Sequence, residues 1–149
     1  MKKFAILGAA LAVCACGPSA KVQKSGDEAT ITLNNGGEKS TITSGKSAPA
    51  ALPAGFTLYP GAEVSSNVTM KGGDGTMTIV SMGTGDGVDK VAAFYKAQAA
   101  KAGITIGMDM STPQSAMIGG NGKGVDFTLT AGPRDGGGTT ANLSFTTKG

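Results

Sequence analysis

The sequence contains no histidine, and its two cysteines, Cys14 and Cys16, both lie near the N-terminus. Without histidine the chain lacks the commonest general base at neutral pH, and with it the usual Ser-His and Cys-His nucleophile pairs. Zinc and copper sites of the His/Cys type are excluded for the rest of the chain. The carboxylates are scattered, and several adjoin glycines in predicted turns: Asp74, Asp86 and Asp135. We therefore expect no enzymatic activity, no metal and no cofactor.

Long hydrophobic runs are also missing after residue 13. The chain begins Met1-Lys2-Lys3 and continues with ten mostly aliphatic residues from Phe4 to Val13. This run fits the core of an export signal and is too short for the roughly 20 residues that span a bilayer as a helix. Without Lys2 and Lys3, the 13 Lys and Arg residues become 11, against 10 Asp and Glu. Such a balance, without a basic patch, predicts no nucleic-acid partner.

The residues Val13-Cys14-Ala15-Cys16 close this signal. They resemble the lipobox of bacterial lipoproteins, in which an aliphatic, a variable and a small residue precede the lipid-bearing cysteine. The resemblance implies a signal peptide at residues 1–15, cleavage after Ala15 and a lipid on Cys16. Two alternatives stay open: Cys14 carries the lipid, or both cysteines are incidental in an ordinary secretory signal.

A lipid on the first mature residue implies a protein anchored in the cell envelope and facing the periplasm. One acyl chain gives only marginal membrane binding, so stable anchoring takes several chains on that residue. Gly17 follows the cysteine. By resemblance to the sorting rule of enterobacterial lipoproteins, the absence of Asp at this position points to the outer rather than the inner membrane.

Residues 16–53 are interpreted as a lipidated tether, of which Gly17 to Gly26 is expected to be flexible. Residues 27–43 are a candidate β-hairpin, because alternating segments flank Asn34-Asn35-Gly36-Gly37. An isolated hairpin is marginal in water, so this one joins the main sheet, pairs with a partner or stays disordered. The Ala/Pro/Ser linker at residues 44–53 places the domain boundary before Ala54.

Residues 54–149 show the patterns of an α+β domain. Alternating apolar residues predict strands near 64–70, 77–82, 104–110, 125–130 and 141–146, with a short apolar stretch at 117–118. Apolar residues at three-to-four spacing from Val88 to Ala102 predict one amphipathic helix, capped by Asp86 and ended by Gly103. We expect an antiparallel sheet of about four to six strands packed on this helix, in the order strand-strand-helix-strand-strand-strand.

Two motifs in this domain carry a family resemblance. The segment Leu58-Tyr59-Pro60-Gly61-Ala62, and the segment Phe94-Tyr95-Lys96 of the predicted helix, resemble a YPGA…FYK-type α+β domain of uncharacterised bacterial envelope lipoproteins. The resemblance runs from about Leu52 to Phe145. The sequence departs from it at Ala99, where leucine is usual, and at Ile104, where tryptophan is usual. The resemblance implies the α+β topology and no particular activity.

Few residues are candidates for contact with a partner. Tyr95 on the helix and Arg134 in a glycine-rich loop form the candidate binding surface. The expected polar face of the sheet is rich in threonine, which suits a surface that meets water, a partner or a glycan: Thr30, Thr32, Thr78, Thr128, Thr130, Thr140 and Thr146. Four methionines in predicted strands are interpreted as core residues rather than as soft ligands for copper(I): Met77, Met82, Met108 and Met110.

These observations favour a membrane-anchored envelope lipoprotein that works as a non-catalytic binding or structural module. Its expected partners are the membrane, through the N-terminal lipid, and an envelope protein or glycan. The alternative is a small-ligand or glycan carrier in the periplasm, with its site on the threonine-rich face or in a cleft beneath the helix.

Overall fold

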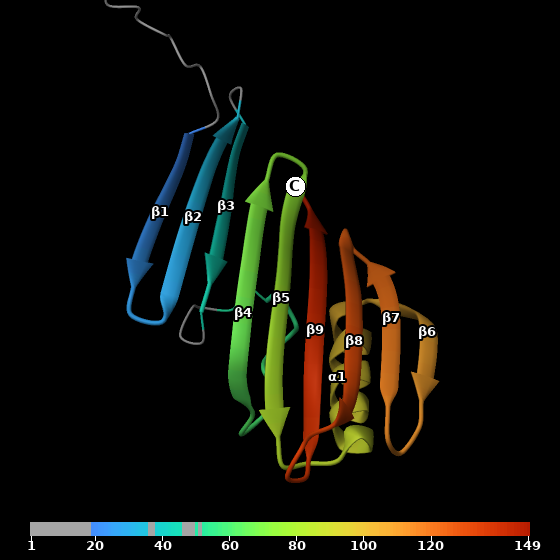
Figure 1. The fold of residues 1–149 in the computed structure, drawn as a ribbon. Coiled ribbons are helices and arrows are strands. Elements are labelled where there is room, and N and C mark those ends of the chain that lie inside the picture. Colours follow the sequence, from blue (N-terminus) through green and yellow to red (C-terminus); the bar gives the residue numbers. More distant parts are fainter. Residues whose placement is uncertain (1–18, 36–37, 46–49, 51) are drawn as a thin grey trace, which may run out of the picture.

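The computed structural model describes residues 19–35, 38–45, 50 and 52–149, which form one antiparallel sheet and one helix (Figure 1). In chain order the elements are β1 (Ser19–Ser25), β2 (Glu28–Asn35), β3 (Glu38–Ser44), β4 (Glu63–Gly72), β5 (Gly75–Thr84), α1 (Val88–Ala102), β6 (Thr105–Ser111), β7 (Ala116–Gly122), β8 (Val125–Pro133) and β9 (Thr139–Lys148). The strands lie side by side in the order β1-β2-β3-β4-β5-β9-β8-β7-β6. Among the described residues, no helix is long and apolar enough to cross a membrane.

The sheet has nine strands, so the prediction of about four to six was wrong. Three additional strands, β1, β2 and β3, lie on the N-terminal side. The predicted order with three strands after the helix was also wrong, because β6, β7, β8 and β9 follow α1. The candidate hairpin joins the main sheet through β3 and β4, where Ile42 pairs with Met70, and the segment expected to be a flexible tether forms β1 against β2. Without β3, the edge of β4 would expose backbone N–H and C=O groups. An extended segment can pair with such groups almost regardless of its side chains. A polar, weakly patterned segment can therefore become a strand without a strong sequence signal.

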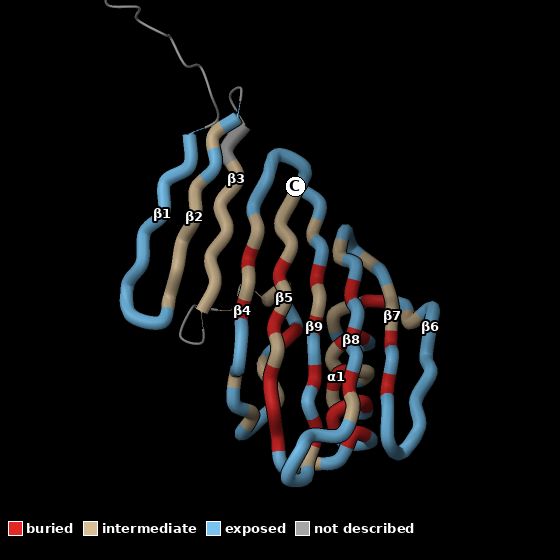
Figure 2. Tube along the Cα trace, in the orientation of Figure 1, coloured by how far each residue is buried: buried red, intermediate tan, exposed pale blue. Residues whose placement is uncertain are grey.

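The two faces of the sheet are occupied differently. Helix α1 packs against β6, β7, β8 and β9 on one face, which we call the helix face (Figure 1). We call the opposite side the open face. Residues paired across antiparallel strands share a face, so the register assigns Val80, Leu143 and Leu129 to the helix face. All three are 0% exposed, and Figure 2 shows the buried residues concentrated where α1 covers the sheet.

Side chains fill the space between α1 and the sheet. Val91, Tyr95 and Ala99 of the helix are fully buried. The segment that precedes β4 adds Phe56, whose ring centroid lies 5.1 Å from that of Phe127 and 4.7 Å from that of Phe145. Close packing of this kind is typical of a protein interior. The cleft expected beneath the middle of the helix is therefore occupied by the core.

The helix ends follow the sequence only in part. Gly103 has φ 76° and its N–H bonds to the carbonyl of Ala100, which confirms the expected left-handed C-terminal glycine. At the other end Gly87, not Asp86, is the N-cap, and it makes no side-chain capping bond. The Asp86 carboxylate instead accepts hydrogen bonds from the Tyr59 hydroxyl (2.8 Å) and the Lys90 ammonium (3.0 Å). This carboxylate therefore ties the segment before β4 to the first turn of α1.

A register shift explains why two methionines are not in the core. Ile106 is half-buried on the helix face, opposite Gly120. The pairing shifts between Ile106 and Met108, so Met108 and Met110 turn to the open face, where they are 39% and 58% exposed. Period-two alternation assumes an unbroken register, and one bulge moves all later side chains to the other face. Of the four methionines expected in the core, only Met82 is fully buried there.

Candidate functional site

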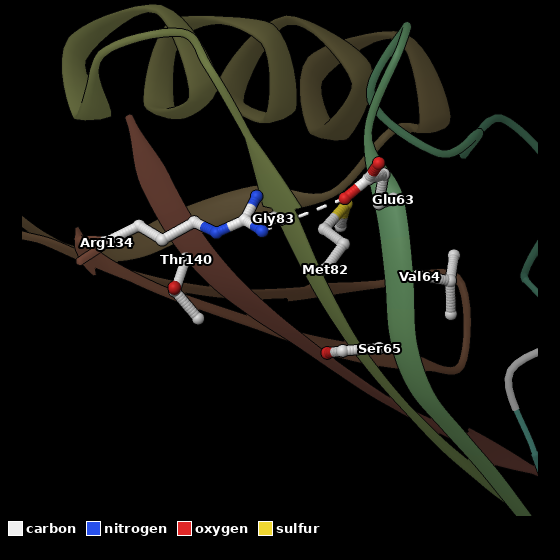
Figure 3. A pocket seen from close by; sticks show the side chains of 7 residues that line it. All are labelled: Glu63, Val64, Ser65, Met82, Gly83, Arg134 and Thr140. Carbon is white, nitrogen blue, oxygen red and sulfur yellow. Dashed lines mark ion pairs between the residues drawn. The ribbon is translucent and has the colours of Figure 1, made fainter. Parts of the chain in front are cut away.

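A surface hollow lies at one end of the sheet, around Arg134 (Figure 3). It has a volume of about 500 Å³. Its walls come from the start of β4, the end of β5, the start of β9 and the loop before β9. The lining residues are Glu63, Val64, Ser65, Met82, Gly83, Arg134 and Thr140. We call it the Arg134 hollow.

Arg134 crosses the end of β5 at a residue that has no side chain. A Cβ on Gly83 would lie 2.6 Å from Nη1 of Arg134, closer than non-bonded contacts allow, and 3.0 Å from its Cζ, which is also tight. The absence of a side chain at position 83 therefore lets the guanidinium lie close over the backbone of β5 on the open face. The backbone of Arg134 is held by a tight loop, because its N–H bonds to the carbonyl of Gly138 and its carbonyl accepts from Gly137.

The guanidinium is only loosely paired. Its Nη2 lies 3.7 Å from Oε2 of Glu63, and the two side chains are 44% and 82% exposed. An exposed ion pair at this distance contributes little, and solvent and salt screen it. A planar guanidinium of this kind can present two parallel N–H donors to a carboxylate or a phosphate. The hydroxyl of Ser65, which bonds to the carbonyl of Ser81 (3.1 Å), and the side chain of Thr140 line the same hollow.

A second hollow, of about 380 Å³, lies at the C-terminal end of α1. We call it the lysine hollow; it is lined by Pro53, Ala54, Gly55, Phe56, Lys101, Ala102, Ile104, Lys123 and Val125. Its surface is mainly apolar, with two lysines. Lys123 lies close over Gly103, since a Cβ there would be 2.9 Å from its Nζ. Cations beside the last turn of a helix also stabilise the helix dipole, so these lysines have a structural role whether or not a ligand binds.

The predicted site residues do not come together. Cys14 and Cys16 lie outside the described residues. Arg134 lines the Arg134 hollow, whereas Tyr95 is 0% exposed and its hydroxyl bonds to the Met82 sulfur at 3.6 Å. Burial raises the pKa of Tyr95 above its ordinary value. The expectation that Tyr95 contacts a partner is therefore wrong, because the helix turns this ring inward.

The neighbouring residue is the more exposed one. Phe94 is half-buried, and its ring lies edge-on to those of Tyr59 and Tyr95, with centroids 5.1 Å apart in each pair. Two adjacent residues on a helix cannot face the same way, and the sequence alone did not decide which of the two points inward.

The threonines do not share one face. Thr30, Thr32 and Thr78 lie on the helix face, because the register places Thr78 opposite the core residue Phe145. The others lie on the open face, as the pairing of Thr146 with Met77 and of Thr130 with Asn142 requires. The single threonine-rich surface expected from the sequence therefore does not exist as one patch.

Tyr59, Asp86 and Lys90 form a hydrogen-bonded cluster of ionisable side chains. Hydrogen bonds from Lys90 and Tyr59 lower the pKa of Asp86. Burial and the bond to Asp86 raise the pKa of Tyr59, so this phenol is harder to ionise than an isolated tyrosine. Within the described part of the chain, no group of three or more His, Cys, Asp and Glu residues could hold a metal ion. The cluster acts as a structural link.

Three charged residues that line the two hollows have no distinguishing pattern in the sequence: Glu63, Lys101 and Lys123. Each is an isolated charge next to a turn or a helix end, which is the usual position of a solvated residue. No local pattern distinguishes such a charge from one that borders a hollow. Glu63 lies opposite Gly83 of the neighbouring strand β5. This pairing follows from the register of the sheet and cannot be recognised in the sequence.

The structure described so far is an α+β domain with a closed core and a hollow that Arg134 lines. A family model described as START domain-like matches residues 63–142, more than half of the 149 residues. The chain belongs to the START domain-like family, and this membership indicates a binding module. The matched region includes every residue that lines the Arg134 hollow. The comparisons with curated proteins and with solved structures give no match.

Proposed function

We propose that this protein is a non-catalytic module that binds an anionic group of a small ligand or of an envelope component in the Arg134 hollow. The observation that carries the proposal is the guanidinium of Arg134, which lies over Gly83 and is loosely paired with the highly exposed Glu63. A carboxylate or phosphate would accept two hydrogen bonds from this guanidinium and displace Glu63. The hydroxyls of Ser65 and Thr140 would provide further polar contacts.

The same proposal places the module on a membrane of the cell envelope. A lipid on Cys16 would hold the protein facing the periplasm, on the outer rather than the inner membrane. Cys16 precedes β1 by only a few residues, so the sheet would lie close to the bilayer surface. Mass spectrometry of the native N-terminus tests this. We expect an acylated Cys16 as first residue, lost in Cys16→Ala and kept in Cys14→Ala; an unmodified, soluble chain would contradict it.

The binding test uses three defined probes: inorganic phosphate, acetate and glucuronate. Titration followed by NMR should shift the signals of Arg134 and Gly83, and Arg134→Gln should weaken binding at least about tenfold, as expected for the loss of a charged hydrogen-bond partner. The matched control is Lys71→Gln, which removes the same charge from an exposed position at the far end of β4. Equal losses in both variants would mean that only net charge matters, and would refute a site at Arg134.

The lysine hollow favours a second candidate function, that of a small-ligand carrier. Its apolar surface, from Phe56, Ile104 and Val125, and its two lysines suit an amphiphile with an acidic head group. Decanoate is a suitable probe. If the carrier function holds, Lys101→Gln with Lys123→Gln should weaken decanoate binding and leave phosphate binding at Arg134 unchanged. Decanoate binding that is insensitive to the double substitution would eliminate this candidate.

A further inference from the structure

One edge of the sheet is open along a whole strand. β1 lies at the end of the strand order and pairs on one side only, with β2, over Ser19–Ser25 without a register shift. All seven residues are exposed (Figure 2). Within the described residues no strand pairs with the outer side of β1. Such an edge presents a row of backbone donors and acceptors to any other strand.

An apolar row on the open face leads to this edge. Reading across the sheet, the register aligns five apolar residues directly opposite one another: Val22, Ile31, Ile42, Met70 and Met77. The four inner residues are half-buried by their neighbours. Val22, the last of the row, is 66% exposed. Of the elements described, none covers this face, since α1 packs on the other side.

The sequence of β1 is compatible with antiparallel pairing to itself. With a two-fold axis at Val22, the two Val22 side chains face each other and extend the apolar row into a second copy. Lys21 then lies opposite Gln23 of the other copy, and Lys24 lies opposite Ala20, so no lysine faces a lysine. Moving the axis to Lys21 places the two ammonium groups opposite each other, and moving it to Gln23 places Lys24 opposite Val22. Like charges directly opposite one another destabilise a strand pair.

We propose that two copies of this chain associate through β1, antiparallel and with Val22 on the two-fold axis, to form one sheet that continues across both copies. This isologous contact is the commonest kind in homodimers. A seven-residue strand pair forms about six to eight backbone hydrogen bonds, and its area is smaller than the roughly 1,600 Å² of a standard interface. The dimer is therefore weak and depends on concentration. The proposal is independent of the ligand hollows and of the lipid.

Sedimentation of the full chain over a concentration series, in mild detergent, tests the association. The native chain should show a reversible monomer–dimer equilibrium. Val22→Lys, which places two ammonium groups on the axis, should raise the dissociation constant at least about tenfold. Met110→Lys is the matched control, because Met110 is a similarly exposed residue, 58% exposed, on the edge strand β6 at the other end of the sheet. A chain that stays monomeric, or an equal loss in both variants, would overturn the proposal.

Disulfide cross-linking in the membrane tests the register. Directly opposed residues have Cα atoms about 4.5–5.5 Å apart, within the range of a disulfide. Val22→Cys should form cross-linked dimers under oxidation. Ala20→Cys should not do so alone, but should when mixed with Lys24→Cys; the unsubstituted chain controls for the native cysteines. Cross-linking that does not depend on position would refute this register. Vesicle binding that Val22→Lys abolishes, without any change in sedimentation, would instead assign the apolar row to the membrane.

Discussion

Substitution of Gly83 by alanine is the most direct perturbation of the Arg134 hollow. The added methyl carbon would lie 2.6, 3.0 and 3.3 Å from Nη1, Cζ and Nε of Arg134, whereas such atoms normally stay about 3.5 Å apart or more. The guanidinium must therefore move outward by roughly 1 Å, which lengthens any hydrogen bond to a bound anion. Because a charged hydrogen bond contributes about 1.5–3 kcal/mol, we expect a loss of affinity of roughly tenfold, or about 1.4 kcal/mol.

The fold should tolerate this change. The crowded atoms belong to the end of a flexible side chain, and the ion pair to Glu63 that would be lost is long and exposed. Replacing glycine by alanine at a compatible position also stabilises a protein by about 0.4–1 kcal/mol, through the unfolded chain. Urea denaturation of Gly83→Ala should therefore give a free energy of unfolding within about 1 kcal/mol of the native value.

Gly132→Ala is the matched control. Gly132 lies on the open face of β8, and a Cβ there would have nothing within 4 Å. We expect phosphate titration, followed by NMR, to give native affinity for Gly132→Ala and a roughly tenfold weaker affinity for Gly83→Ala. Equal affinities in the two variants would show that the position of the guanidinium over Gly83 does not determine binding.

Three further predictions concern the core and the charges. Leu143→Ala removes a side chain that is 0% exposed at the centre of the sheet and should lower the free energy of unfolding by about 2–5 kcal/mol in urea; a loss below about 1 kcal/mol would contradict the packing described. Tyr95→Phe removes only the hydroxyl that contacts the Met82 sulfur and should change the free energy of unfolding by less than about 1.5 kcal/mol. A loss as large as that of Leu143→Ala would contradict the weak hydrogen bond assigned to this hydroxyl. The pKa values of Asp86 and Asp109 are lowered, chiefly by hydrogen bonds from lysines. The stability that these bonds contribute should be complete above the unfolded pKa of about 3.8 and lost as the pH falls through the lower folded-state pKa values. Asp86→Asn with Asp109→Asn should reduce the loss of stability at acid pH, and an unchanged loss would refute the assignment.

The parts of the fold that the sequence predicts are those in which one side of an element is buried by its neighbours. Val125, Phe127 and Leu129 alternate with polar residues in the way that β8 alternates between its two faces. The spacing from Val88 to Ala102 likewise matches the bounds of α1. Burial against a continuous core selects apolar residues at the period of the element. The local sequence pattern therefore shows which side of the element is buried.

The parts that the sequence does not predict depend on partners remote in the chain. The position of β3 in the sheet follows from its pairing with β4. A bulge in β6 turns Met108 and Met110 to the open face. Backbone pairing and register shifts select few side chains, so they leave little trace in composition or periodicity. The same holds for Tyr95, which occupies the inward position that the sequence left undecided between two adjacent rings.

The sequence by itself determined the absence of imidazole and of thiols beyond Cys16, the α+β class and the position of the single helix, because these follow from residue identity and from local periodicity. Only the tertiary structure decided how many strands the sheet has, which face each threonine occupies, and that Arg134 lies over Gly83 within reach of Glu63. These features arise where segments far apart in the chain meet. These tertiary contacts depend on backbone hydrogen bonding and on the space left between side chains, and neither can be read from a single segment.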